Sequence, residues 1–326
     1  MTAAATANPA SARKRWRAVD GIVLLDKPQG LTSTQALQRV RRALQAEKAG
    51  HAGTLDPMAT GMLPLCFGQA TKACGELLGQ RKAYRATVLL GAATDTGDAE
   101  GQVVERRDVP AALSPAAIEA ALAGLRGERL QVPPMYSALK RDGRPLYELA
   151  RRGETVERAA RPITIDRLEL VAAAEGSLEI EVTCSKGTYV RVLAADIAAR
   201  LGTLGHLGAL RRLRVEPFAA EAMVTLDRIE ADVAPGHATP NWLLPVDAAF
   251  PGLPLVRLDE TLSLRLRQGR TIEPPANLST PDGPLWRVYD DAHGFLGLVE
   301  ADSGGHLKVV RLFVPGAGSV PDAPKT

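Results

Sequence analysis

The apolar positions near the start of the chain change from an extended pattern to a helical one. Residues 21–27 form a short apolar run that ends before Pro28, which predicts a strand. The pair Thr32 and Gln35 has the spacing of a capping box, and apolar residues follow it at helical intervals. These apolar residues are Leu37, Val40 and Leu44. The opposite face of this predicted helix carries arginines, and we expect them either to contact phosphates or to be exposed to solvent alone.

The central part of the chain predicts more strands and helices in mixed order. Apolar residues alternate over 82–90, with Tyr84 among them, which is typical of a half-buried strand. Ser114 and Pro115 have the properties of a helix cap and first turn, and this helix is expected to run to about residue 125. Further elements are expected at 163–171, 178–184 and 210–215 as strands, and at 189–201 as a helix. Residues 127–160 are irregular, basic and rich in Pro and Gly, so we expect a mobile insertion there.

After Pro245 the pattern changes to short apolar runs separated by Gly and Pro turns, which predicts a small β-rich domain. The runs lie at 254–258, 285–289, 294–300 and 307–313. Before Pro245, strands and helices are interleaved without a clean βαβ repeat. The sequence therefore favours an α+β body over a doubly wound sheet.

Length and charge add little to this organisation. A chain of 326 residues is long for one average domain, so two domains are expected. The formal net charge of +3 is carried by residues 1–20, because this segment contains four basic residues and a single acidic one, Asp20. Residues 1–18 are expected to form a disordered basic arm that is either a solvated tail or an RNA contact. Binding of RNA by the rest of the chain requires basic residues to gather on one face.

The cysteines and the hydrophobic runs limit the class of protein further. The three cysteines are Cys66, Cys74 and Cys184, and none has the spacing of a redox or zinc motif. We therefore expect reduced thiols, no metal and a cytoplasmic location. No run approaches 18 uninterrupted apolar residues and no signal-peptide core is present, so no membrane segment is expected.

Residues 50–72 contain the strongest chemical signal in the chain. Asp56 precedes Pro57, which biases the aspartate backbone towards extended geometry. Glycines at 50, 53, 61 and 68 permit tight bends around it. A carboxylate on a stiff step inside a permissive loop suits a site that must present one oxygen accurately. The spacing alone favours the alternative, a turn with a solvated aspartate, and the segment lacks a Walker motif.

This segment resembles the central motif of the B-type (TruB) pseudouridine synthases, which convert uridine 55 in the T loop of tRNA to pseudouridine. Five further motifs of that family are matched in order along the chain, at 25–30, 82–85, 134–140, 184–191 and 205–212. The resemblance covers roughly residues 20–250, whereas the remainder is similar only in its pattern of short strands.

The resemblance implies a pseudouridine synthase catalytic fold with a central mixed, mainly antiparallel sheet flanked by helices, followed by a small β-rich domain similar to the PUA type. The implied boundaries are 1–18 for the arm, 19–248 for the catalytic domain, 249–315 for the PUA-like RNA-binding domain and 316–326 for a disordered tail. Within the catalytic domain, residues 127–160 are implied to be an RNA-binding insertion.

The implied reaction breaks the bond between uridine N1 and ribose C1′ and rejoins the base through C5. This isomerisation is redox-neutral, so no cofactor and no metal are expected. The resemblance assigns Asp56 as the nucleophile, Arg191 as its charge partner and Tyr189 as a group available for proton transfer. Whether Asp56 attacks C6, attacks C1′ or removes a ribose proton is left open.

The remaining site residues follow from the same resemblance and from the need to flip the target uridine out of its loop. Tyr84 is expected to stack on the flipped base and Leu210 to form an apolar wall. His51 is expected to support the rearranged loop, and Lys27 to brace the site. Lys140 is expected to grip RNA from the insertion, and additional phosphate contacts are expected from Arg211, Arg212 and Arg214. An ordinary core tyrosine, a structural histidine and a solvated charged loop are the alternatives for Tyr84, His51 and the insertion.

The expected partner is the T stem-loop of tRNA, bound by a monomer that needs no obligatory protein partner. An alternative function is a tRNA-folding chaperone that uses the same RNA grip independently of catalysis. A guide-RNA-dependent subunit is a third possibility, and it predicts inactivity on a bare stem-loop.

Overall fold

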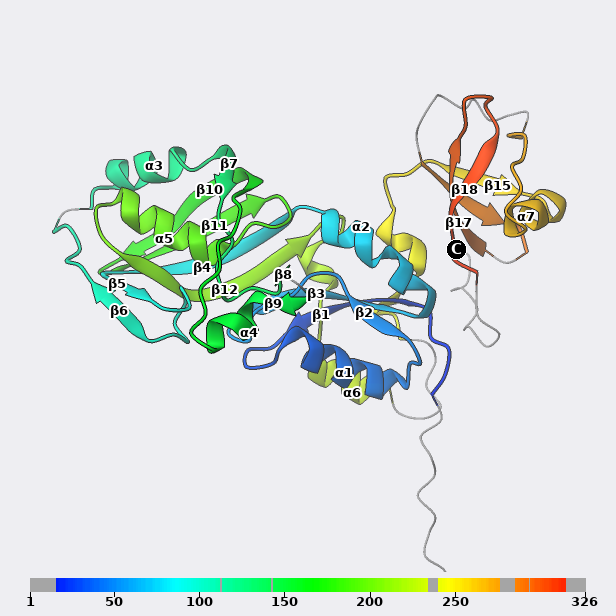
Figure 1. The fold of residues 1–326 in the computed structure, drawn as a ribbon. Helices are drawn as coiled ribbons and strands as arrows, with labels where there is room; N and C mark the ends of the chain where they lie inside the picture. Colours follow the sequence, from blue (N-terminus) through cyan, green and yellow to red (C-terminus); the bar gives the residue numbers. More distant parts are fainter. Residues whose placement is uncertain are drawn as a thin grey trace, which may run out of the picture.

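The computed structural model describes residues 16–314 except 112, 142, 234–239, 276–284 and 293. Residues 1–15 of the predicted arm and the predicted tail at 316–326 lie outside the described residues. The last residues of the predicted arm contact the body, because the Arg17 side chain donates to the Leu44 carbonyl (3.0 Å) and Trp16 packs under Arg41. Figure 1 shows a large sheet with helices around it and a smaller C-terminal body.

The large sheet has ten strands, most of which pair antiparallel with their neighbours. Its main path is β13-β1-β3-β12-β4-β11-β10-β7, with β14 paired to β1 and β2 paired to β3. The strands are β1 (Gly21–Lys27), β2 (Ala49–His51), β3 (Thr60–Phe67), β4 (Lys82–Leu90), β7 (Gly127–Gln131), β10 (Arg161–Ala174), β11 (Ser177–Cys184), β12 (Gly205–Val215), β13 (Val224–Thr225) and β14 (Leu243–Leu244). The β1–β13 and β12–β3 pairs are parallel, so the prediction of a mixed, mainly antiparallel sheet is confirmed.

Helices flank this sheet, as the sequence predicted. Those of the large body are α1 (Ser33–Leu44), α2 (Cys74–Gly79), α3 (Pro115–Ala123), α4 (Leu146–Arg151), α5 (Val190–Arg200) and α6 (Leu226–Asp232). Short 3-10 turns lie at Gly68–Ala73, Ala220–Ala222 and Val246–Ala249, and two small hairpins pair β5 (Ala92–Thr94) with β6 (Val103–Arg106) and β8 (Lys140–Arg141) with β9 (Arg144–Pro145). The Thr32 capping box and the Ser114 cap are both present, so these two helix starts are confirmed. In Figure 1, α1 and α6 lie side by side at one end, and α3 and α5 lie at the other.

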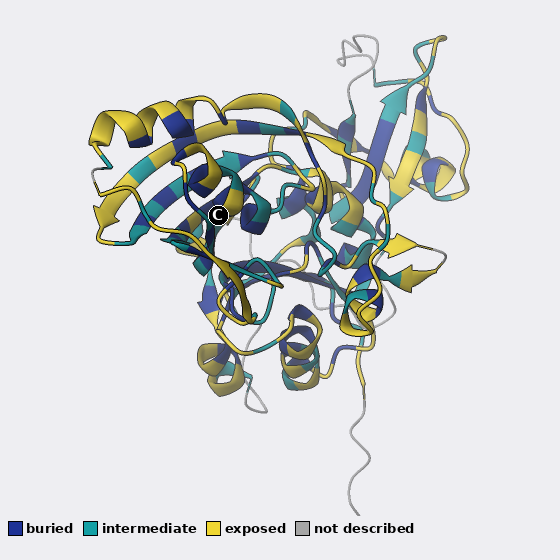
Figure 2. Ribbon diagram, turned by 60° about the vertical axis from the view of Figure 1, so that its left-hand side comes forward, coloured by how far each residue is buried: buried dark blue, intermediate teal, exposed yellow. Residues whose placement is uncertain are grey.

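One core cluster runs along the large sheet and contacts the helices on it. The alternation that turns apolar side chains into this cluster is clearest in β11, where buried and half-buried residues alternate along the strand. Leu37, Val40 and Leu44 of α1 turn into this cluster, as their helical spacing predicted. Figure 2 shows the buried residues along the sheet and on the helix faces that meet it. Burial of this apolar surface fixes the strands that carry the candidate site.

The C-terminal body contains a four-stranded sheet in the order β15-β16-β17-β18. Its strands are β15 (Leu255–Leu258), β16 (Trp286–Asp290), β17 (Gly294–Ala301) and β18 (Leu307–Leu312), so the predicted β-rich region is confirmed. The helix α7 (Glu260–Arg267), capped by Asp259, was not predicted. A second core cluster joins this region to the large body, since Ile22 and Met62 share it with Phe250 and Phe313.

Two expectations for local structure were wrong. Residues 60–67 were interpreted as part of a glycine-rich loop, but they form the buried strand β3. β3 is covered on both faces, so its sequence lacks the alternation that marks a half-buried strand. Residues 127–160 were expected to be irregular, but they include the edge strand β7, a hairpin and α4. β7 is largely exposed except for the buried Gln131, so main-chain pairing with β10 rather than an apolar pattern forms it.

Candidate active site

The segment that presents Asp56 lies between β2 and β3 and is fixed by hydrogen bonds from several directions. Ser33 at the start of α1 bonds to both sides of Leu55, accepting from its N–H (2.8 Å) and donating to its carbonyl (3.1 Å). The Gly30 N–H donates to the Pro57 carbonyl (2.8 Å). These contacts hold the residues on both sides of Asp56, so the backbone of this loop is fixed rather than free to vary.

Replacing Ser33 with alanine tests this fixation. Both polar groups of Leu55 would lose a buried partner, so we expect a loss of roughly 1–3 kcal/mol in the free energy of unfolding. Urea unfolding measures the change. The exposed turn residue Ser303 is the matched control, and Ser303→Ala should stay within about 0.5 kcal/mol of the parent. Equal stabilities of the two variants would contradict the proposed fixation.

Asp56 forms an ion pair with Arg191, the second residue of α5. Asp56 Oδ2 lies 3.1 Å from Arg191 Nε, and the Arg191 side chain is only 7% exposed. The other guanidinium nitrogens donate to the Thr96 carbonyl (3.0 Å) and the Tyr136 carbonyl (2.6 Å). Arg191 is therefore fixed by three chain segments, and its fork geometry directs one nitrogen at the carboxylate.

Asp98 is a site residue that sequence reasoning missed. Its Oδ2 lies 3.5 Å from Arg191 Nη1, and the side chain is 5% exposed. Asp98 also accepts from Thr96 Oγ1 (2.6 Å) and from the Glu100 N–H (3.1 Å). Arg191 thus lies between two carboxylates, one held inside the fold and one, Asp56, with 36% of its side chain exposed. The segment around Asp98 carried no signal beyond that of a polar loop.

The two neighbours of Asp56 act on its pKa in opposite directions. Burial raises the pKa of the Asp56 carboxyl above its ordinary value, Arg191 lowers it, and Asp98 raises it again. Arg191 is therefore the main group that opposes the rise in the pKa of this half-buried acid.

Lys27 lies at the end of β1 and braces the other side of the same loop. It is fully buried, and its ammonium donates to the carbonyls of Leu31 (2.6 Å), Pro28 (2.9 Å) and Pro57 (3.4 Å). Burial lowers the pKa of Lys27 to about 8, although the nearby Asp56 opposes this shift. These contacts join the end of β1 to the residue that follows Asp56.

The lowered pKa of Lys27 predicts a pH dependence of stability. Between pH 8 and 10.5 the unfolded chain holds the Lys27 proton more firmly than the folded chain does, because the folded pKa is about 8 and the ordinary value is 10.5. The unfolded state then binds more protons, so stability rises with pH through this window. We expect Lys27→Met to flatten part of that rise in urea unfolding series. An unchanged slope in the variant would contradict the shift.

The aromatic candidates lie on β4 and directly before α5. Tyr84 on β4 is 7% exposed, and burial raises the pKa of its hydroxyl. Tyr189 precedes α5, and its backbone is held by Gln131, whose side chain accepts from the Tyr189 N–H (2.8 Å). Burial also raises the pKa of Tyr189, and the charge of Asp56 adds to the shift in both tyrosines. Both hydroxyls therefore lie within electrostatic reach of Asp56.

Leu210 lies on β12, which pairs with the strand of Tyr84, whereas His51 lies on β2, which pairs with β3. Leu210 on β12 pairs with Ala86, two residues from Tyr84, so both side chains project from the same face of the sheet. His51 on β2 has a lowered pKa because of burial and the charge of Arg212, so it is neutral near pH 7. Its buried Nδ1 has no hydrogen-bond partner among the residues that the structure describes.

Lys140 is not brought to Asp56 by any contact between described residues. It is exposed on β8 and lines a separate cavity of about 370 Å³ in the predicted insertion. This cavity is also lined by Arg141, Glu157, Arg158 and Arg161.

The expected phosphate contact by Arg212 is wrong, because its side chain is 1% exposed. The alternation of β12 turns this residue into the protein. Arg211 pairs with Asp26 (2.8 Å) and Arg214 lies 3.5 Å from Glu216, so both outward arginines have acidic partners.

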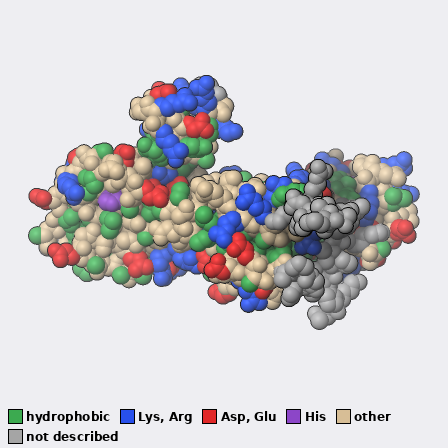
Figure 3. All heavy atoms as spheres, turned by 90° about the horizontal axis from the view of Figure 1, so that it is seen from below, with side chains coloured by type: hydrophobic (Ala, Val, Ile, Leu, Met, Phe, Trp, Pro, Cys, Tyr) green, Lys and Arg blue, Asp and Glu red, His purple; other side chains and the backbone are tan. Residues whose placement is uncertain are grey.

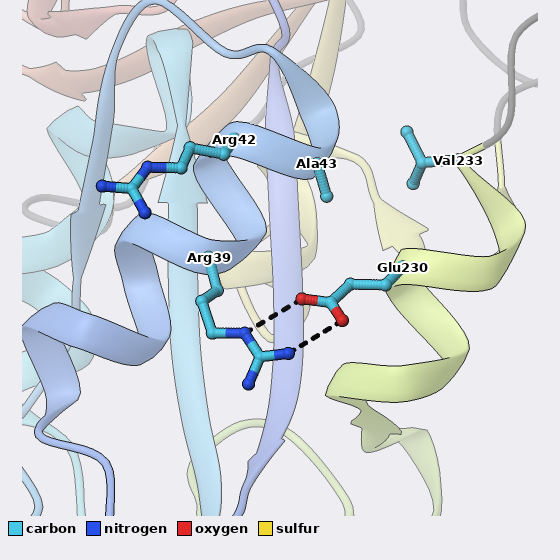
Figure 4. Close-up of a pocket in the computed structure, with 5 residues that line it drawn as sticks. All are labelled: Arg39, Arg42, Ala43, Glu230 and Val233. Carbon is cyan, nitrogen blue, oxygen red and sulfur yellow. Dashed lines mark hydrogen bonds and ion pairs between the residues drawn. The ribbon is translucent and has the colours of Figure 1, made fainter.

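Another cavity lies between α1 and α6, away from Asp56. It measures about 400 Å³ and is lined by Arg39, Arg42, Ala43, Glu230 and Val233. Figure 4 shows Arg39 bonded to both oxygens of Glu230 (3.0 and 2.8 Å). This arginine of the predicted helix therefore meets a carboxylate. In the part of the chain that the structure describes, no group of three or more His, Cys, Asp or Glu could hold a metal ion. Nor is any helix there long and apolar enough to cross a membrane.

The fold thus brings a buried arginine against a partly exposed aspartate, whose charge acts on the hydroxyls of Tyr84 and Tyr189. Three family models cover the chain: "TruB family pseudouridylate synthase (N terminal domain)" at 41–190, "tRNA pseudouridylate synthase B C-terminal domain" at 191–251 and "Pseudouridine synthase II TruB, C-terminal" at 254–313. The chain belongs to the TruB family of pseudouridine synthases, which are tRNA-modifying isomerases.

Relatives support this membership over almost the whole length. A "tRNA pseudouridine synthase B" of Aromatoleum aromaticum is 52% identical over 300 residues, covering 92% of this chain and 94% of the relative. The protein of the same name in Burkholderia mallei is 51% identical over 308 residues, covering 94% and 97%. Among solved structures, "Crystal Structure of a Cbf5-Nop10-Gar1 Complex" has a similar chain with a TM-score of 0.67, 25% identity and coverage of 90% of this chain and 85% of that one.

Proposed function

We propose that this chain isomerises uridine 55 in the T loop of tRNA to pseudouridine, with Asp56 as the reacting carboxylate. The observation that carries the proposal is the 3.1 Å ion pair between Asp56 and the buried Arg191. The family and the names of the relatives support tRNA as the substrate. The alternative of a tRNA-folding chaperone has no support in these comparisons, since every relative described above is named as a synthase.

In this proposal Asp56 reacts at the junction of sugar and base. A base that enters the pocket displaces water, which would favour the neutral acid. Arg191 opposes that change because its guanidinium remains charged and fixed beside the carboxylate. The ion pair thus keeps Asp56 reactive in the complex with RNA.

The target uridine must leave its stacked position to reach Asp56. Tyr84 is then the stacking surface, a contact generally worth about 1–3 kcal/mol, and Leu210 the adjoining apolar wall. Tyr189 is the group for proton transfer, since the charge of Asp56 contributes to the raised pKa of its hydroxyl. His51, whose buried Nδ1 has no hydrogen-bond partner among the described residues, supports the rearranged loop, and Lys27 braces the catalytic segment.

The insertion at 127–160 is the proposed RNA grip. The projecting part at the top of Figure 3, which corresponds by its place in Figure 1 to β8, β9 and α4, carries many Lys and Arg side chains. The four basic residues that line the cavity there are Lys140, Arg141, Arg158 and Arg161. Phosphates of the T stem are the natural partners for such a surface.

Replacing Lys140 with alanine tests the grip. Losing one phosphate contact should weaken binding of a T stem-loop severalfold and reduce the slope of log K against log salt concentration by roughly 1. Filter binding at several salt concentrations gives both quantities. Arg107→Ala, which removes an exposed arginine paired with Glu105, should change neither. Identical salt slopes for the Lys140 variant and the parent would exclude a phosphate contact at this residue.

The rest of the proposal concerns organisation and partners. We take residues 19–248 as the catalytic domain and 249–315 as a PUA-like RNA-binding domain in which Gly269 and Arg270 are candidate contacts. The enzyme is proposed to act as a monomer, without cofactor, metal or obligatory protein partner. The similar chain in the Cbf5-Nop10-Gar1 complex belongs to a multi-protein assembly, so activity of this chain alone separates the two modes.

Mapping the product position tests the proposed function. Purified protein is incubated with an unmodified tRNA transcript, and pseudouridine is located by carbodiimide modification and primer extension. We expect one stop, at uridine 55, and no stop when cytidine replaces that uridine. A stop at a different uridine would contradict the proposed specificity, and no stop anywhere would contradict the enzyme assignment.

A further inference from the structure

Arg212 is the largest of the fully buried side chains in the described part of the molecule. It lies on β12 between β3 and β4, opposite Gly61 on one side and Tyr84 on the other. Its Nε donates to the Met62 carbonyl (2.6 Å), and Nη2 donates to the Gly53 carbonyl (3.2 Å) in the segment that leads to Asp56. A Cβ atom at Gly61 would overlap the Arg212 backbone, so the close approach of the two strands requires glycine there. Arg212 therefore links the catalytic segment to the centre of the sheet.

Unlike the other arginines around the site, Arg212 has no carboxylate partner. Arg191 pairs with Asp56 and Asp98, and Arg211 pairs with Asp26. None of the ion pairs between described residues includes Arg212. A buried cation without a counter-charge is costly, and burial lowers the pKa of Arg212 from its ordinary value. The guanidinium is nevertheless basic enough that arginine stays charged in proteins. Because burying this charge without a counter-charge destabilises the fold, we expect the charge to serve a function.

The charge of Arg212, which lies on a strand of the large sheet, acts on titratable groups around the site. It contributes to the lowered pKa values of His51, Lys27 and Lys82, which surround it. Asp56 responds instead to Arg191, Asp98 and Lys27. The two buried arginines thus act on different parts of the site: Arg191 acts on the carboxylate, and Arg212 acts on the region around Tyr84.

Arg212 and Tyr84 are register partners on β12 and β4, and both side chains are buried. The charge of Arg212 opposes the rise that burial causes in the pKa of the Tyr84 hydroxyl. A guanidinium has only donors, so the tyrosine oxygen is the group that can accept from it.

The chemistry of the reaction gives that charge a role. Breaking the N1–C1′ bond leaves its electron pair on N1, so the detached base is an anion until N1 takes a proton. Re-formation joins C1′ to C5, and C5 releases its proton. A preorganised cation in a site without water stabilises negative charge that develops on the base.

We propose that Arg212 is a positioning residue for the isomerisation, which holds the Tyr84 hydroxyl and the Gly53 carbonyl in fixed relation to Asp56 and places a positive charge behind the base that Tyr84 stacks. This inference rests on the proposed roles of Asp56 and Tyr84. It assigns to Arg212 an effect on the rate of the chemical step rather than on RNA affinity.

Single-turnover rates and RNA dissociation constants of five variants test the assignment: Arg212→Met, Arg212→Lys, Arg85→Met, Tyr84→Phe and the double variant. Arg212→Met removes the charge and the donors at similar length, and we expect about a 100-fold lower rate with a dissociation constant within about threefold of the parent. Arg212→Lys retains a charge without the fork and should recover about tenfold of that loss. Arg85→Met is the matched control, because Arg85 adjoins Tyr84 on β4 but is exposed and pairs with Glu181; it should keep the parent rate. Tyr84→Phe combined with Arg212→Met should lose less than the product of the separate losses, because the two residues act through one contact.

The outcomes separate this inference from the proposed function. If a folded Arg212 variant turns over at the parent rate, or if the losses of Arg212→Met and Tyr84→Phe multiply fully, the positioning role is wrong. Failure of both Arg212 variants to fold, judged by thermal melting, would reduce Arg212 to a core residue and would also overturn it. Full activity of Asp56→Asn in the same assay would overturn the proposed function instead, whatever the Arg212 variants do.

Discussion

Replacing Asp56 with asparagine should lower the single-turnover rate on a T-arm RNA by roughly 10⁴-fold or more, with little change in RNA affinity. Asparagine keeps the shape of the side chain but removes the negative charge that reacts at the glycosidic bond. The loop itself should survive, because Ser33, Gly30 and Lys27 hold its backbone and not the Asp56 side chain. The effect should therefore appear in the rate alone.

Rapid-mixing assays with enzyme in excess over RNA measure this rate, and filter binding measures the affinity. Asp166→Asn is the matched control, since Asp166 is an acid that forms an ion pair with Arg81 on another part of the sheet. It should keep the parent rate. A rate for Asp56→Asn within about tenfold of the parent would mean that Asp56 is not the reacting group.

Replacing Arg191 with methionine should have the second largest effect. The variant would leave Asp56 beside Asp98 without the charge that separates them, and burial already raises the pKa of Asp56. The carboxylate would hold its proton to higher pH, so the acidic limb of the pH–rate profile should move to higher pH. We expect about a 10²–10³-fold lower rate near pH 7, of which part returns as the pH is raised.

A pH–rate profile between about pH 5 and pH 9 tests this expectation. Arg129→Met is a suitable control, because Arg129 forms a comparable half-buried ion pair with Asp196 on the other side of α5. Its acidic limb should coincide with that of the parent. An Arg191→Met profile that is merely lower at every pH, without a displaced limb, would contradict the role of Arg191 in keeping Asp56 ionised.

Elements whose stability depends on local sequence were predictable. The capping box at Thr32 and the apolar stripe of α1 are both determined within two turns of chain, and both are present. The alternation at 82–90 identified β4 because one face of that strand is buried and the other is less so. The same rule failed for β3, which is buried on both faces and therefore shows no alternation.

The site depends on contacts that no local pattern encodes. Arg191 and Asp56 are brought together only by the folded sheet and α5, and spacing alone left Asp56 as either a catalytic group or a turn residue. The resemblance to the TruB family assigned both residues to the site, and the structure shows that they form an ion pair. Asp98 had no such signal, and the motif that includes Arg212 did not show that its side chain is buried, because an arginine-rich strand looks alike whether its side chains face water or the interior.

Release of tritium from a T-arm RNA labelled at C5 of uridine 55 tests the central claim most directly, because only replacement of the C5 proton by the new bond to ribose releases the label. The assay uses the purified chain alone, with chelator and no added cofactor. We predict release of one tritium per RNA by the parent and none by Asp56→Asn that still binds the RNA. Equal release by the two proteins, or none by the parent at saturating concentration, would contradict the account.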